Sequence, residues 1–145
     1  MPKSSDVRAV VRHAFIQNAA VVTLLGADGE VFPAHTLRAA EVTQSHPAVI
    51  IEMRGGRDFI SALAGWRRAF IYAYSAVAIA DAEELYEACR VVLNREGVEG
   101  RRDEAGDLCE PTCVYGIEED GTFDGWNPET RSWFVRGEWR LLGIG

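Results

Sequence analysis

Aromatic rings and small apolar side chains alternate between Arg67 and Val77. The rings are Phe70, Tyr72 and Tyr74, and the smaller residues are Ala69, Ile71, Ala73 and Val77. Because successive side chains of a β-strand point to opposite faces, this pattern predicts one long strand. Apolar groups on both sides of the strand indicate that both faces of its sheet are covered.

Three further segments are predicted to be strands. Ala48–Met53 is a continuous apolar run after a proline, and Thr112–Ile117 and Ser132–Leu142 are rich in β-branched and aromatic residues. Turn signals separate them, and they lie at Arg54–Asp58, Asp120-Gly121, Asp124-Gly125 and Asn127-Pro128. Glu30–Gln44 has no clean period and is predicted to be an extended, loop-like passage. Phe59–Gly65 fits either a helical turn or a loop excursion.

Two segments have the spacing of amphipathic helices. The first begins at Ser5 or Asp6, and its apolar stripe is Val7, Val10, Val11, Ala14 and Phe15. The second begins at Asp81 as N-cap and ends near Gly97, with the inward stripe Ala82, Leu85, Tyr86, Cys89, Val92 and Leu93. The helix–strand–strand–helix–strand–strand order predicts an α+β fold, in which a mostly antiparallel sheet of four or five strands packs against two main helices.

The length of 145 residues fits a single domain over 1–145. Loops that order on contact with a partner are expected at 54–65 and 96–111, where glycine and charged residues gather. No apolar run is long enough to cross a bilayer, so we expect a soluble, unexported protein that does not associate with membranes. The net charge of −7 argues against electrostatic binding of nucleic acid.

No catalytic, cofactor-binding or metal-binding pattern is recognisable. The histidines, at 13, 35 and 46, and the cysteines, at 89, 109 and 113, have no metal-ligand spacing. Serine-nucleophile and phosphate-binding glycine motifs are absent from the sequence. We therefore expect neither enzymatic activity nor a cofactor. A small α+β enzyme or ligand-binding protein, and a regulatory or immunity-type protein, remain as alternatives.

Tryptophan and arginine gather near the end of the chain, and both are enriched at interface hot spots. On a strand from Ser132 to Leu142, the core side takes Trp133, Val135, Trp139 and Leu141. The opposite side takes Phe134, Arg136, Glu138, Arg140 and Leu142. The candidate interface residues are Phe134, Arg136, Glu138 and Arg140, together with Arg54, Arg57 and Asp58 in the first predicted loop.

The sequence resembles the tail-completion, or tail-terminator, proteins of long-tailed bacteriophages. The resemblance is carried by Val7–Val11 with Ala19–Gly26, Val31–Pro33, Ser45–Glu52, Arg68–Tyr74, the helix Asp81–Leu93 and the close Trp139–Leu142. The chain departs from the family pattern at Asp120–Asn127 and Glu96–Pro111.

The resemblance implies a structural protein of the head–tail junction, assembled in the host cytoplasm. It implies a ring, typically a hexamer, that terminates the tail tube. The partners would be other copies of the chain, the major tail tube protein and the head connector or stopper. DNA would pass through the lumen without specific binding. Another neck protein, a stopper or adaptor, is the alternative within this class.

Overall fold

A six-stranded sheet organises the protein in the computed structural model, which describes residues 6–27, 29–32, 47–58, 64–93, 98–99, 113–129 and 131–144. The helices are α1 (Asp6–Gln17), α2 (Ala19–Leu25) and α4 (Ile79–Leu93). The strands are β1 (Glu30–Phe32), β2 (Ala48–Asp58), β3 (Ala64–Ser75), β4 (Val98–Glu99), β5 (Cys113–Asn127) and β6 (Ser132–Ile144).

The strands lie in the order β1-β2-β3-β6-β5-β4. The short β1 pairs parallel to β2, and the other neighbouring strands pair antiparallel. The two alternating segments, β3 and β6, are therefore adjacent at the centre of the sheet. The prediction of an α+β fold with a mostly antiparallel sheet is confirmed, and the two extra strands are short edge pieces.

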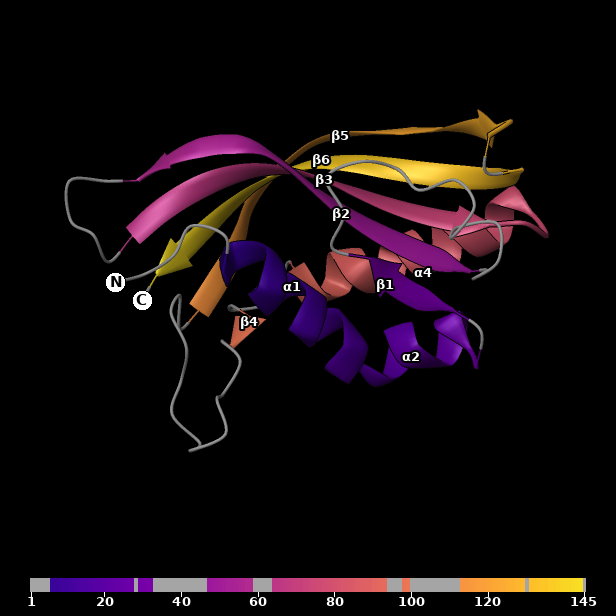
Figure 1. Ribbon diagram of the computed structural model, residues 1–145, viewed down its shortest axis with the longest axis horizontal. Helices are drawn as coiled ribbons and strands as arrows, with labels where there is room; N and C mark the ends of the chain where they lie inside the picture. Colours follow the sequence, from indigo (N-terminus) through magenta and orange to yellow (C-terminus); the bar gives the residue numbers. More distant parts are fainter. Residues whose placement is uncertain are drawn as a thin grey trace.

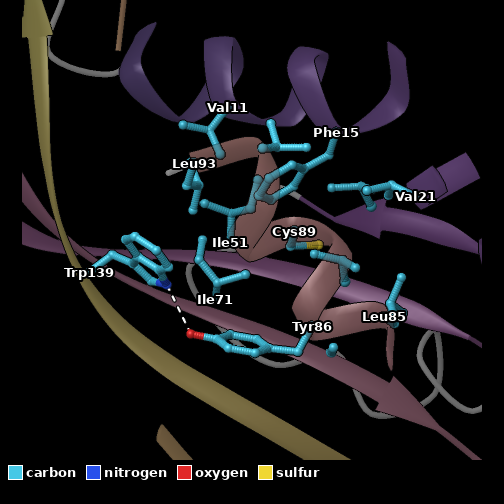
Figure 2. Packing of buried hydrophobic residues seen from close by; sticks show 14 of the residues in the cluster. Val11, Phe15, Val21, Ile51, Ile71, Leu85, Tyr86, Cys89, Leu93 and Trp139 are labelled. Atoms are coloured by element: carbon cyan, nitrogen blue, oxygen red, sulfur yellow. Dashed lines mark hydrogen bonds between the residues drawn. The ribbon is translucent and has the colours of Figure 1, made fainter. Parts of the chain in front are cut away.

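All three helices lie on the same side of the sheet (Figure 1). Val11 and Phe15 reach down from α1 and are fully buried, as are Ile51 and Ile71 on the facing strands (Figure 2). Together with the buried side of α4 they form the main hydrophobic core. The predicted apolar stripes of α1 and α4 are the surfaces that the structure buries, as far as their side chains are described.

The segment Arg54–Asp58 is a strand, and the prediction of a turn there is wrong. β2 continues to Asp58 and pairs with β3 as far as Gly65. The register shifts between Met53 and Gly56, so the glycines mark a β-bulge and not a chain reversal. Residues 59–63 of the predicted loop over 54–65 lie outside the described residues, as does most of 96–111.

The turn predictions at Asp120-Gly121 and Asp124-Gly125 are also wrong. β5 runs through both dipeptides to Asn127, and only the Asn127-Pro128 signal marks the true hairpin turn to β6. Register shifts on either side of Glu119 accommodate the extra residues, and Gly121 has a φ of 136°, which favours glycine. Gly121 therefore stands at a bulge, whereas Gly125 is paired with Phe134 in regular register.

The helix boundaries differ slightly from the sequence prediction. α4 begins at Ile79, so Asp81 lies in the first turn, where its charge favours the helix dipole, and not at the N-cap. The apolar stretch Ala19–Leu25 is the helix α2. The Asn18 side chain caps it by accepting a hydrogen bond from the Val21 N–H at 3.1 Å. Within the described residues, no helix has the length and apolarity to span a membrane.

Candidate interaction surface

The sheet face opposite the helices carries a grid of large side chains. The cross-strand rows are Ala48–Tyr74–Phe134, Ile50–Tyr72–Arg136–Phe123 and Glu52–Phe70–Glu138. We call this surface the open face, because no described element packs over it (Figure 1). Ala48, Ile50 and Tyr74 are nevertheless buried on this face, so the expectation that both faces of β3 are covered is confirmed for the helix side and for the Tyr74 end of the open face.

The rings of the open face contact one another. Tyr72 and Tyr74 stack with their ring centroids 5.9 Å apart, and Phe134 lies 6.0 Å from Tyr74 and 5.8 Å from Phe123. Tyr74 is almost completely buried in this cluster. Phe123, at the β5 side of the cluster, remains 56% exposed. Large exposed rings of this kind are typical of contact surfaces in assemblies.

Arg136 lies in the middle of this cluster. Its guanidinium carbon is 4.8 Å from the centroid of the Phe70 ring and 5.2 Å from that of Phe123. A cation between two rings is stabilised by their quadrupoles, and its planar fork is fixed in orientation. A shallow depression of about 200 Å³ lies beside it, lined by Asp120, Gly121, Thr122, Phe123, Arg136 and Glu138.

The other charges of the open face have partners. Arg68 forms an ion pair with Glu138, and Arg140 interacts within the structure. Glu52 interacts with the Tyr72 hydroxyl, and burial together with this carboxylate raises the pKa of Tyr72 above its usual value of 10.0. No ion pair of Arg136 with a carboxylate is present within the described part of the chain. Within the described residues, Arg136 thus contacts aromatic rings and the Tyr72 hydroxyl but no carboxylate.

The structure brings only part of the predicted interface together. Phe134, Arg136, Glu138 and Arg140 share the open face, as the period of β6 predicts. Arg57 and Asp58 pair with Trp66 and Gly65 near the other end of the sheet, and only the backbone of 54–58 is described. Six residues of β3 separate Trp66 from Tyr72, or about 20 Å at strand spacing. Arg57 and Asp58 thus lie outside the aromatic cluster, while Arg54 falls within the register shift of β2, next to Met53.

Several members of the surface, among them Phe70, Tyr72 and Phe123, were not among the predicted interface residues. The alternation of β3 identified Phe70 and Tyr72 as sharing a face, but nothing local indicates that β6 is the neighbouring strand. Phe123 was assigned to a turn region and so had no predicted face. Their position beside Arg136 follows only from the pairing of β6 with β3 and β5.

A polar network on the helix side holds α4 to the sheet. The Trp139 indole N–H donates to the Tyr86 hydroxyl oxygen at 3.0 Å (Figure 2), and the Tyr86 hydroxyl donates to the Glu119 carboxylate. Arg90 Nε lies 3.4 Å from the same carboxylate oxygen. Three elements, α4, β5 and β6, are thereby fixed at one point. This network is structural, because its groups are occupied with one another inside the fold.

Alkaline pH is expected to destabilise the fold through these buried groups. Burial, and then the hydrogen bond to Glu119, raises the pKa of Tyr86, and burial raises the pKa of the Cys89 thiol. In the unfolded chain these groups ionise near their ordinary pKa values of 10.0 for tyrosine and 9.0 for cysteine, while in the folded chain they keep their protons to higher pH. The folded state then binds more protons, so stability falls as pH rises above about 9.

Above its unfolded pKa, each such group adds at most about 1.4 kcal/mol per pH unit to the loss in the free energy of unfolding. Urea unfolding measured from about pH 8 to about pH 11 checks this. Tyr86→Phe should reduce the slope only above about pH 10, while Cys89→Ala should reduce it from about pH 9. A free energy of unfolding that stays constant across this range would contradict the assignment.

Of the groups considered for catalysis, the side chains of His13 and Cys89 are described. His13 is half-buried on α1, and Cys89 is buried in the apolar core as a free thiol. His35, His46 and Cys109 lie outside the described residues. Among the residues that are described, no cluster of three or more His, Cys, Asp or Glu side chains is arranged to hold a metal ion.

Trp133, predicted to be core, is 36% exposed, and that prediction is wrong. It packs edge-on against Trp126, with ring centroids 5.1 Å apart, at the end of the β5–β6 hairpin. The strand period places it on the same side of β6 as the buried Val135, but Trp133 itself is only partly covered. Trp126 is 47% exposed, so this end of the sheet carries a second apolar patch.

Comparisons with known proteins give a fold and no family. No protein-family model matches the sequence, and no curated protein matches it. Among solved structures, the fold is similar to that of a chain in the virion of a native gene transfer agent (GTA) particle, with a TM-score of 0.59 and 11% sequence identity. The similarity covers 97% of this chain and 96% of that chain. The two chains therefore share one fold over nearly their whole lengths.

Proposed function

We propose that this chain is a structural protein of a phage-like virion, located at the head–tail junction. In this role it forms a ring that terminates the tail tube and joins it to the head connector. The observation that carries the proposal is the fold similarity, which spans nearly all of both chains and leaves no large insertion that would point to another role. The fold similarity supports a structural virion protein, and the resemblance of the sequence to tail-terminator proteins supports the position at the head–tail junction.

The surface supports an assembly role over a chemical one. The open face presents an arginine between aromatic rings, and the hairpin end presents two exposed tryptophans. Tryptophan, tyrosine and arginine are the residue types that dominate binding energy at protein interfaces. Such a surface acts by fit to another protein. The partners in this proposal are other copies of the chain, the major tail tube protein and the connector or stopper.

The acidic composition suits passage of DNA. Each copy has a net charge of −7, so a closed ring of several copies has a strongly negative field. A duplex in its lumen is repelled by the walls and slides without being held. Specific DNA binding is not part of this function.

Mass photometry and negative-stain imaging test the proposal. We expect rings of the purified chain, formed alone or on addition of the major tail tube protein of the same virion. Arg136→Glu with Arg140→Glu should abolish the rings, because both charges lie on the open face. The same pair should lower the free energy of unfolding by about 1 kcal/mol or less, since neither side chain is in the core.

Arg131→Glu is the matched control, because Arg131 is exposed at the hairpin turn and lies off the open face. Rings of this variant should form normally. A chain that stays monomeric in every mixture, or that binds a small molecule with saturation instead, would contradict the proposed function. A large loss of folding stability in the Arg136/Arg140 variant would mean that these arginines serve the fold.

A further inference from the structure

Among the described residues of the open face, the Arg136 guanidinium interacts with aromatic side chains and forms no ion pair with a carboxylate. Arg136 is held between Phe70 and Phe123, and the nearby carboxylate of Glu138 is engaged by Arg68. A guanidinium fixed in this way is oriented to receive a carboxylate in a two-pronged contact. The exposed ring of Phe123 beside it offers apolar area to the stem of the arriving side chain. The surface therefore fits a partner with acidic side chains on a low-relief, partly apolar background.

The outer side of α4 has this character. Asp81, Glu83, Glu84 and Glu87 are all exposed on the first half of the helix. Glu87 pairs with Arg90 at 3.0 Å, while the first three form no ion pair within the described part of the chain. Ala80 and Ala88 lie one turn to either side of Glu84, so the helix surface around that carboxylate is shallow.

Among the described side chains, neither α1 nor α2 offers a comparable surface. The exposed residues of α2 are uncharged, and they are Ala19, Ala20, Val22 and Thr23. On α1 the exposed side chain among those described is Gln17, and the half-buried polar residues include Arg12 and His13. The uncompensated carboxylates of the helical side are thus concentrated on α4. They face away from the sheet, because the opposite side of the helix is packed on it.

We infer that the open face of one copy binds the acidic outer side of α4 of the next copy, with Glu83 and Glu84 placed against Arg136. The two surfaces lie on opposite sides of one molecule, so they cannot meet within a copy (Figure 1). Joining them between copies gives a head-to-tail contact, which closes into a ring when the rotation per copy permits. This inference rests on the proposed ring and names the two surfaces that build it.

Charge reversal on each side tests the pairing. Arg136→Glu and the double variant Glu83→Arg/Glu84→Arg should each weaken association at least about tenfold, as loss of a buried charge pair does at other interfaces. Combining all three changes in one chain should restore association, because the charges are then exchanged. Glu129→Arg, an exposed charge reversal at the hairpin turn, is the control and should change nothing. Melting curves of all variants confirm folding, and Phe123→Ser serves as a second open-face variant should Arg136→Glu unfold.

The two single-sided variants also test the head-to-tail geometry when they are mixed. Each should be defective alone, and a mixture should assemble, since every copy then meets a complementary neighbour. Normal ring formation by the Arg136→Glu variant, or by the Glu83→Arg/Glu84→Arg variant, would overturn this pairing. It would not overturn the proposed ring. A second outcome would also overturn it: the Arg136→Glu variant associates with the unmodified chain, and the α4 variants have no effect. The open faces of two copies would then pack on each other. Absence of any assembly by the unmodified chain overturns the proposed function, and this inference with it.

Discussion

Replacing Gly137 with alanine is expected to lower the free energy of unfolding by about 3 kcal/mol. A Cβ at this position would lie 1.6 Å from the Tyr86 hydroxyl oxygen and 2.5 Å from its ring carbon Cζ. The ring would have to leave, and with it the hydrogen bonds from Trp139 and to Glu119. The backbone of Gly137 has ordinary strand geometry that any residue can adopt. Glycine is therefore needed here for the close approach of the Tyr86 ring and not for its conformational freedom.

Chemical denaturation of Gly137→Ala and of Gly125→Ala measures this effect. Gly125 is the matched control, since a Cβ there would meet Phe134 only at an ordinary contact distance of 3.5 Å. We expect Gly125→Ala to be nearly neutral. In a chain that already carries Tyr86→Ala, the Gly137 substitution should cost far less, because the clashing ring is gone. Equal costs in the two backgrounds would show that the contact with Tyr86 is not the cause.

Phe15→Ala is expected to cost about 3–5 kcal/mol of folding stability. Phe15 is fully buried and joins α1 to the core shared by the sheet and α4 (Figure 2). Removing its ring leaves a cavity that two helices and a sheet cannot close by small movements. Thermal or urea unfolding followed by circular dichroism measures the loss. A cost below about 1 kcal/mol would mean that α1 is only loosely attached.

Phe123→Ala is the counterpart of Phe15→Ala on the open face. Its ring is 56% exposed, so we expect a loss of stability of about 1 kcal/mol or less. Assembly, in contrast, should be strongly reduced, because Phe123 flanks Arg136 at the proposed contact. The two phenylalanines thus separate folding from assembly in a single chain. If Phe123→Ala assembled normally, the open face would not be the contact surface.

Periodicity was sufficient to predict the long regular elements of this fold. The two-residue period of β6 placed Phe134, Arg136, Glu138 and Arg140 on one face, and the structure confirms this grouping. The helical period likewise identified the buried side of α4. These predictions succeed because side-chain direction within one element depends only on local backbone geometry. The fold class follows from the order of such elements.

Strand length and register could not be predicted in the same way. Gly55-Gly56 and Asp120-Gly121 have the composition of turns, yet pairing with β3 and β6 keeps the chain extended through them as bulges. A dipeptide cannot show which of these outcomes its neighbours impose. Because Phe123 was assigned to a turn, the aromatic row it completes with Arg136 and Tyr72 could not be recognised.

Photocrosslinking from position 123 tests the head-to-tail contact most directly. p-Benzoyl-phenylalanine replaces Phe123, the assembled protein is irradiated, and the cross-linked peptides are identified by mass spectrometry. We predict intermolecular products that join position 123 to the α4 segment 79–93 of another copy. Products that join position 123 to the open face of another copy, or an assembled particle with no intermolecular product, would contradict the account.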